Sequence, residues 1–176
     1  YRMPAANAII AGPELLVLDA GEGASRTMSR LRLPVERVSA VFITHWHSDH
    51  FSGLGQVLHT SWNARREQDV PVIGPAGVDR VIAALTLLYQ ADVTYRSAGH
   101  VESLDPRFAT GVPVPVHLPP GEDGAVVFDR NGVVVTAFQV DHGHVEPAFG
   151  YRVTYAGKCA FFSGDTVASP RVARAA

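Results

Sequence analysis

Apolar residues lie in short runs separated by turn residues, and this pattern predicts alternating strands and helices. Two runs at 8–11 and 15–18, joined by Gly12-Pro13-Glu14, predict a hairpin. The nearly continuous apolar run at 38–44 is typical of a strand that is buried on both faces. Apolar residues at helical spacing predict helices over about 53–65 and 78–89, with a shorter helix over 25–33 and a short strand at 70–73.

Between residues 92 and 124 the apolar residues follow neither helical nor strand spacing, and prolines stand at 106, 113, 115, 119 and 120. We expect an irregular insertion or lid here, because long loops inside a compact domain are usually functional. Four strands then follow at 125–128, 133–140, 149–155 and 158–162, with Asn131-Gly132 as a strong hairpin signal. The layout predicts a single α/β domain over residues 1–176, built as a sandwich with mixed sheets.

Composition narrows the class of protein. The chain has 176 residues with 15 basic and 17 acidic side chains, a formal charge of −2 and no basic run. Strong nucleic-acid binding is therefore not indicated, since it needs a positive stripe. The single Cys159 excludes an internal disulfide and a thiolate zinc cage. The apolar runs are too short for a membrane span. We expect a soluble protein, with the cytoplasm slightly favoured, although the sequence starts at Tyr1 without Met and reads as a partial domain.

The candidate chemistry centres on residues 45–50 (HWHSDH), directly after the predicted buried strand. In an extended segment residues i and i+2 point the same way, so His45 and His47 can reach one metal ion together. The chain then turns into a helix, and Asp49 with His50 can face a second ion. Imidazole and carboxylate ligands without a thiolate suit Zn²⁺ and also Mn²⁺ or Fe. The alternative interpretation is a polar loop with coincidental histidines.

This string resembles the first signature of the metallo-β-lactamase superfamily. Residues 18–23 (LDAGEG) look like the turn that precedes that signature. Residues 141–144 (DHGH) with 147–152 (PAFGYR) are similar to the third-histidine motif of the ribonuclease Z and arylsulfatase-like branch, and 163–166 (SGDT) resembles its aspartate motif. The resemblance implies an αββα sandwich with two mixed β-sheets. The fold would be incomplete in this chain, which lacks counterparts of the family's first strand and last histidine ligand.

The resemblance also implies a set of ligands for two Zn²⁺ ions. One ion would be bound by His45, His47 and His142, the other by Asp49 and His50, and Asp165 would bridge both. From the residues themselves, Asp165 follows an apolar strand on a tight glycine turn, which projects a carboxylate from the sheet edge.

The third histidine is open between His142 and His144. His142 is favoured because it lies nearer the strand end, and His144 then becomes a substrate-facing residue and a candidate general acid. Asp19 is expected to accept hydrogen bonds near the metals rather than to bind them. His59 is expected to be structural or on the surface, and Cys159 to be buried.

The function favoured by these residues is a dinuclear metal hydrolase of small phosphodiester or aryl sulfate esters, in which Asp49 helps to steer a hydroxide. A tRNA 3′-processing endonuclease of the ribonuclease Z type is an alternative, disfavoured because 152–163 is one hairpin without room for a long arm. An iron-dependent oxidoreductase on the same fold is disfavoured by His47. A non-catalytic metal-binding remnant is the last alternative. A homodimer is possible, as in the resembled family.

Overall fold

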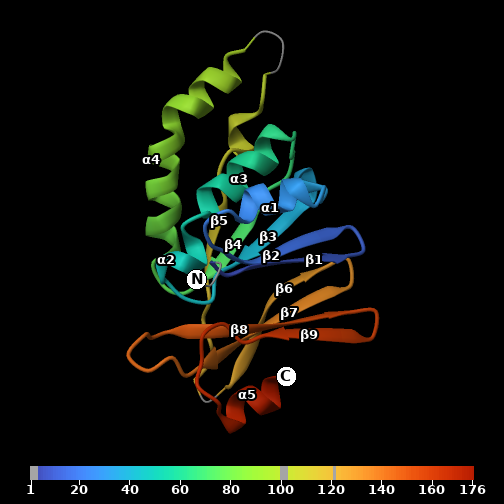
Figure 1. The fold of residues 1–176 in the computed structure, drawn as a ribbon, viewed down its shortest axis with the longest axis vertical. Coiled ribbons are helices and arrows are strands. Elements are labelled where there is room, and N and C mark those ends of the chain that lie inside the picture. The colour runs from blue at the N-terminus through green and yellow to red at the C-terminus, as the bar shows by residue number, and fades with distance from the viewer. Residues whose placement is uncertain (1–3, 100–102, 121) are drawn as a thin grey trace.

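Two β-sheets pack face to face, and helices cover their outer faces (Figure 1). The computed structural model describes residues 4–99, 103–120 and 122–176. The α/β class and the two-sheet sandwich predicted from the sequence are confirmed. No helix in the described ranges is long and apolar enough to cross a membrane.

The first sheet is mixed and has the order β1-β2-β3-β4-β5. β1 and β2 form the antiparallel hairpin, and the other neighbours are parallel. Its strands are β1 (Ala6–Ala11), β2 (Glu14–Ala20), β3 (Val38–Phe42), β4 (Pro71–Gly74) and β5 (Val112–Pro115). The helices that belong to this half are α1 (Ala24–Arg30), α2 (Ser48–Phe51), α3 (Leu54–Asn63) and α4 (Val78–Ser97), with 3-10 turns at Val35–Arg37 and Pro106–Phe108.

The second sheet has the order β6-β7-β8-β9 and is antiparallel throughout its described strands, so the prediction that both sheets are mixed is wrong for this one. The reason is local, because each pair is joined by a hairpin or a short loop, and parallel pairing needs a long crossover. The strands are β6 (Gly124–Arg130), β7 (Val133–Val140), β8 (Ala148–Tyr155) and β9 (Lys158–Phe162), and α5 (Pro170–Ala175) packs on the outer face.

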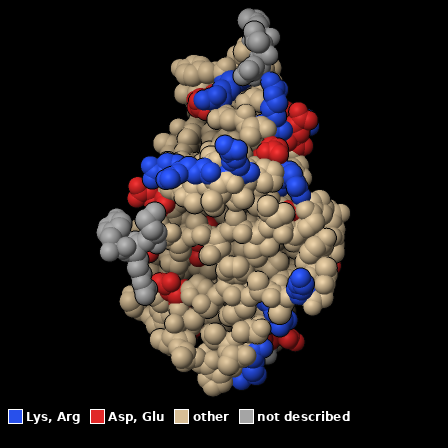
Figure 2. Space-filling model, turned by 45° about the vertical axis from the view of Figure 1, so that its right-hand side comes forward, with Lys and Arg blue, Asp and Glu red and all other residues tan. Residues whose placement is uncertain are grey.

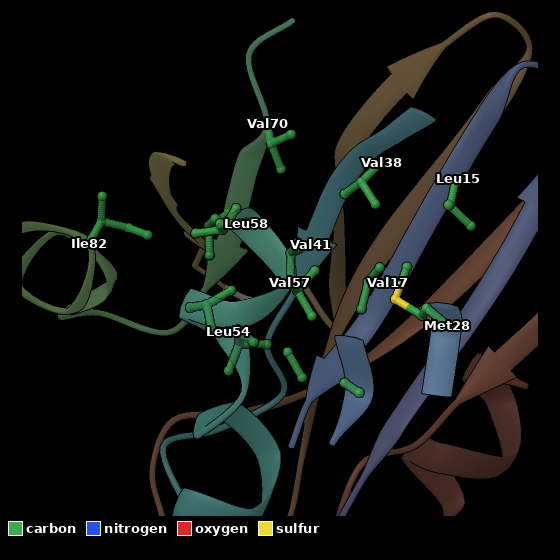
Figure 3. Close-up of a cluster of buried hydrophobic side chains, with 14 of the residues drawn as sticks. Leu15, Val17, Met28, Val38, Val41, Leu54, Val57, Leu58, Val70 and Ile82 are labelled. Carbon is green, nitrogen blue, oxygen red and sulfur yellow. The ribbon is translucent and has the colours of Figure 1, made fainter. Parts of the chain in front are cut away.

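Alternation along β2 divides the core into two layers. Leu15 and Val17 face the helices, and Leu16 and Leu18 face the second sheet. All four side chains are at most 1% exposed, and burial of each stabilises the fold by roughly 1.5–3 kcal/mol. Figure 3 shows the helix-side layer, in which strand residues meet apolar side chains of α1, α3 and α4. The labelled residues of this layer are Leu15, Val17, Met28, Val38, Val41, Leu54, Val57, Leu58, Val70 and Ile82.

The segment predicted as irregular, 92–124, is partly regular. α4 continues to Ser97, where its last turns are exposed and therefore lose the apolar period that marks a packed helix. β5 forms despite its two prolines because it is an edge strand. The N–H of Val112 donates to the residue directly before β4, and the N–H of Val116 donates to β4 itself. Pro113 and Pro115 occupy the alternate positions, which face away from that partner strand.

The first part of the same segment is fastened to the C-terminal end of α3. Trp62 Nε1 donates to the carbonyl of Asp105 at 2.9 Å, and the buried Arg66 guanidinium donates to the carbonyls of Phe108 and Gln68. Residues 100–102 and 121, which also fall in the segment, lie outside the described residues. The lid function stays a prediction. Cys159, expected to be buried, is exposed because β9 is an edge strand of the second sheet.

A carboxylate joins the two sheets. Glu14 is 2% exposed and accepts hydrogen bonds from Arg130 Nε at 3.0 Å and Asn131 Nδ2 at 2.7 Å. Burial alone raises the pKa of Glu14, but the hydrogen bonds from Arg130, Asn131 and Ser39 outweigh it, so the pKa is lowered below its usual 4.5.

Glu14→Gln should lower the free energy of unfolding by about 2 kcal/mol at neutral pH, because hydrogen bonds to a charged group contribute roughly 1.5–3 kcal/mol. A carboxyl with a lowered folded-state pKa stabilises above pH 4.5 and loses that contribution as pH falls through the folded value. As the pH falls below 5, the free energy of unfolding of the variant should therefore decrease less than that of the parent, as measured by urea denaturation at each pH. An equal dependence of the free energy of unfolding on pH in the two proteins would contradict this role.

Candidate metal centre

The predicted ligands gather where strands of the two sheets end. His45 and His47 follow β3, and His50 lies in α2. His142 follows β7, and Asp165 follows β9. The sheets are joined here by a hydrogen bond from the N–H of Phe149 to the Thr44 carbonyl at 2.9 Å.

Three histidines form the first group, called here the three-histidine cluster. Nε2 of His45 lies 2.9 Å from Nδ1 of His47, and Nε2 of His142 lies 3.4 Å from that same Nδ1. The three nitrogens converge on one point within 4.8 Å of one another. The structure thus brings His142 to the cluster, and it leaves His144 exposed outside it.

His45 also belongs to a second group, called here the mixed cluster, with His50 and Asp165. Nε2 of His50 lies 3.5 Å from Oδ1 of Asp165 and 3.9 Å from Oδ2 of Asp49. Asp49 stands at the margin, with its side chain 63% exposed. A cleft of about 330 Å³ opens beside this cluster and is lined by Asn7, Leu18, Asp19, His50, Phe162 and Asp165 among others.

The donor set fits divalent cations. Ligand bonds of 2.0–2.2 Å in tetrahedral geometry place neighbouring donor atoms about 3.4 Å apart. Three of the separations within the clusters, at 2.9, 3.4 and 3.5 Å, lie around this value, and all of the ligand atoms in each cluster lie within 4.8 Å of one another. Unprotonated imidazole nitrogens this close repel one another unless a proton or a cation lies between them, so the arrangement fits a shared proton or a bound cation.

A residue that the sequence reasoning missed, Thr44, connects the two clusters. Its Oγ1 donates to Oδ2 of Asp19 at 3.0 Å and lies 3.0 Å from Nδ1 of His45. Oδ2 of Asp19 also lies 2.8 Å from Nδ1 of His50. The assignment that satisfies every group has both histidines donating through Nδ1–H, which leaves each Nε2 free to bind a cation. The sequence signal that could have identified Thr44 is its position directly before His45.

Asp19 takes the role expected for it, since its carboxylate accepts from Thr44 and His50 and points to no cluster as a ligand. The side chain is 4% exposed. A buried carboxylate in this position fixes the ring orientation of His50 and keeps its Nδ1 protonated.

The protonation of the histidines follows from burial and charge. Burial, together with the neighbouring His50, His47 and His142, lowers the pKa of His45 to about 4, so this ring is neutral at pH 7. Burial also acts to lower the pKa of His50, but the Asp19 hydrogen bond and the charges of Asp19, Asp165 and Asp49 raise it overall. Within the mixed cluster, positive charge is therefore stabilised at His50 and disfavoured at His45.

Two glycines permit the close approach of these segments. A side chain at Gly53 would meet the Gly21 carbonyl at 2.3 Å. Gly164 has φ +61, and a Cβ there would lie 2.9 Å from the Cβ of Thr44. Only glycine allows the end of β9 to turn this close to Thr44, and this contact places Asp165 beside His50.

Residues 14–176 match the profile of the β-lactamase superfamily domain, and the chain belongs to that family. Ribonuclease Z of Mycobacterium marinum is 34% identical over 163 residues, which cover 91% of this chain and 56% of that protein. Ribonuclease Z of Mycobacterium avium is 33% identical over 160 residues, with 89% and 54% covered. The chain thus spans about half the length of the curated relatives it matches.

Solved structures agree with this assignment. Human tRNase Z, short form, superposes with a TM-score of 0.69 at 26% identity, covering 92% of this chain and 62% of that chain. The metallo-β-lactamase fold protein YhfI from Bacillus subtilis has a TM-score of 0.60 at 13% identity, over 96% of this chain and 57% of that one. The second likeness supports the fold alone.

Proposed function

We propose that this chain carries the metal centre of a ribonuclease Z-like phosphodiesterase that hydrolyses RNA. The observation that carries the proposal is the pair of clusters that share His45. Two adjoining sites for divalent cations are what hydrolysis of a phosphodiester by paired cations requires. The similarity to proteins named ribonuclease Z favours RNA over the small phosphodiester and aryl sulfate substrates expected from the sequence.

His45, His47 and His142 would hold one divalent cation, and Asp49 with His50 and Asp165 would hold the other, with Zn²⁺, Mn²⁺ and Fe all compatible with the donors. When bound, the cations would lower the pKa of water to near neutrality and stabilise negative charge on phosphoryl oxygens. The carboxylate of Asp165 lies close to both His45 and His50 and would bridge the two cations. Asp49 is exposed beside His50 and is placed to accept a proton from water. His144 stays the candidate general acid.

The hairpin between β8 and β9 limits how RNA is recognised. Its turn is only Ala156-Gly157, so no long arm leaves the domain there. The basic side chains on the face drawn in Figure 2 form separate groups rather than a continuous stripe. We therefore propose that the cleft beside the mixed cluster binds the scissile end of the RNA and that this domain makes few contacts to the body of the substrate.

The test compares substrates with and without an RNA body. Protein loaded with Zn²⁺ or Mn²⁺ should cleave a precursor tRNA with a 3′ extension and also bis-p-nitrophenyl phosphate, and EDTA should abolish both activities. Because few contacts to the RNA body are expected, a short single-stranded RNA should be cleaved within about tenfold of the rate for the precursor. Turnover of p-nitrophenyl sulfate alone would replace this proposal with the arylsulfatase-like one.

The same experiment also tests the iron-dependent oxidoreductase and the non-catalytic metal-binding alternatives. Redox-active iron in the purified protein with no hydrolysis would favour the oxidoreductase. Metal binding without any turnover by the full-length protein would favour a non-catalytic role. The homodimer also stays a prediction, and the exposed apolar side chains of α4, Leu87, Leu88 and Tyr95, are where we would expect a second copy to contact.

A further inference from the structure

The strand that leads into the metal ligands ends with a carbonyl that the sheet itself cannot satisfy. Beyond the paired residues of β3 and β4, the N–H of Ile43 donates to the Ile73 carbonyl at 2.8 Å. In a parallel ladder, the N–H and C=O of one residue bond to two residues of the neighbouring strand that lie two positions apart. The ladder partner of the Ile43 carbonyl would therefore be the N–H of residue 75. That residue is Pro75, which has no N–H.

Tyr151 of β8 supplies the missing donor from the second sheet. Its phenol O–H donates to the Ile43 carbonyl at 2.8 Å, and the same oxygen lies 3.5 Å from the Ile73 carbonyl. The side chain is 0% exposed, and its ring packs on Phe42 with the ring centroids 5.3 Å apart. Burial raises the pKa of Tyr151 well above its usual 10, so the phenol keeps its proton and acts as a donor at neutral pH.

The peptide unit between Ile43 and Thr44 is thus held at both ends. Its C=O accepts from Tyr151, and its N–H, which belongs to Thr44, donates to Oδ1 of Asp19 at 2.8 Å. The two groups of a trans peptide point in opposite directions, so rotation of this unit would break both hydrogen bonds together. The next carbonyl, that of Thr44, accepts from the N–H of Phe149 at 2.9 Å. Two neighbouring residues of the β3 end are therefore fixed by β8.

The orientation of Thr44 bears on the ligands themselves. Its Oγ1 lies 3.0 Å from Nδ1 of His45 and donates to Oδ2 of Asp19, which also lies 2.8 Å from Nδ1 of His50. Groups that hydrogen-bond to the second nitrogen of a ligating histidine fix the orientation of its ring. Rotation of the preceding peptide would displace this hydroxyl, and Nε2 of His45 would then no longer point at the other nitrogens of the three-histidine cluster.

We propose that Tyr151 is a positioning residue of the metal centre, whose hydroxyl replaces the N–H that Pro75 lacks and thereby holds His45 in its ligating orientation. The inference rests on the metal centre of the proposed function. Tyr151 acts through the backbone of residues 43–44 and not as a ligand. The second sheet would in this way determine the geometry of ligands that the first sheet carries.

Tyr151→Phe is the test, because phenylalanine keeps the ring that packs on Phe42 and removes only the donor. The variant should bind Co²⁺ about tenfold or more weakly than the parent, as other groups behind metal ligands do, measured by competition with a chelator. At saturating Co²⁺ its visible absorption spectrum should also differ, because that spectrum reports the geometry of the ligands. A loss of stability alone would leave the spectrum of the saturated protein unchanged.

Two further variants serve as control and rescue. Tyr155→Phe removes a hydroxyl from the same strand, where the phenol lies against Gly12 in the turn between β1 and β2, and it should keep the affinity and spectrum of the parent. Pro75→Ala supplies an N–H at the ladder position. Combined with Tyr151→Phe, it should restore most of the lost affinity and the spectrum of Pro75→Ala alone. The double variant also carries the test should Tyr151→Phe fail to fold.

The outcomes separate this inference from the proposed function. A parent protein that binds no Co²⁺ would overturn the metal centre and the inference together. A Tyr151→Phe protein with the affinity and spectrum of the parent would overturn the inference and leave the metal centre intact. An equal loss in Tyr155→Phe would also overturn it, since that result indicates a general loosening of β8. A double variant that binds much more weakly than Pro75→Ala would show that the hydroxyl does not stand in for a ladder N–H.

Discussion

His45→Ala is expected to lose the metal ion bound by its Nε2, to bind the other ion more weakly, and to lose more than about 100-fold in turnover. His45 is fully buried and is the one residue common to the three-histidine cluster and the mixed cluster. Even residues behind the ligands change metal affinity or activity by 10–100-fold, so loss of a buried ligand that lies between the two sites should exceed that range. His47→Ala should remove one metal and reduce occupancy of the other less. Metal content by mass spectrometry and phosphodiester turnover are measured on the same samples.

The matched control is His117→Ala, an exposed histidine outside both clusters, which should keep metal and rate. Circular dichroism establishes that each variant is folded. Asp165→Ala should also abolish turnover and lower metal content, because its carboxylate lies 3.5 Å from His50 Nε2. A His45→Ala protein that binds two metals as tightly as the parent would show that the two clusters are not the metal sites.

Asp19→Asn should weaken metal binding by about 10–100-fold and lower the free energy of unfolding of the metal-free protein by about 2 kcal/mol. The substitution keeps the shape of the side chain and the left-handed backbone at this position, where φ is 59. It places an N–H₂ group opposite donors from Thr44 and His50, because Oδ2 of Asp19 accepts from both. His50 would then turn its acceptor nitrogen toward residue 19 and its N–H toward the mixed cluster.

Urea denaturation in EDTA and metal titration with a competing chelator separate the two effects. Asp129→Asn, on an exposed position of β6, is the control and should change neither quantity. Thr44→Val should give a smaller loss of metal affinity than Asp19→Asn, because it removes the hydroxyl links to His45 and Asp19 but keeps the hydrogen bond between Asp19 and His50. Unchanged metal affinity in Asp19→Asn would mean that the carboxylate does not orient His50.

The local pattern of apolar and turn residues was sufficient to predict the strands and turns in which consecutive residues are buried or a turn signal is present. The run at 38–44 became β3 with all of its residues buried, and Asn131-Gly132 became the turn between β6 and β7. The prediction failed where burial ended, at the last turns of α4, and where pairing depended on a partner far along the chain. β5 is the clearest case, because nothing within residues 112–115 indicates which strand edge their alternate N–H groups will meet.

The same division applies to the metal centre. The chain by itself determined the ligand types, because His45, His47, Asp49 and His50 stand within six residues and need only a strand followed by a turn to project together. Tertiary structure alone decided that His142 rather than His144 reaches the cluster, that His45 is shared, and that Thr44 and Asp19 lie behind the ligands. The physical reason is that these contacts join strand ends more than 20 residues apart, whose meeting is set by packing of the two sheets and not by any local preference of the backbone.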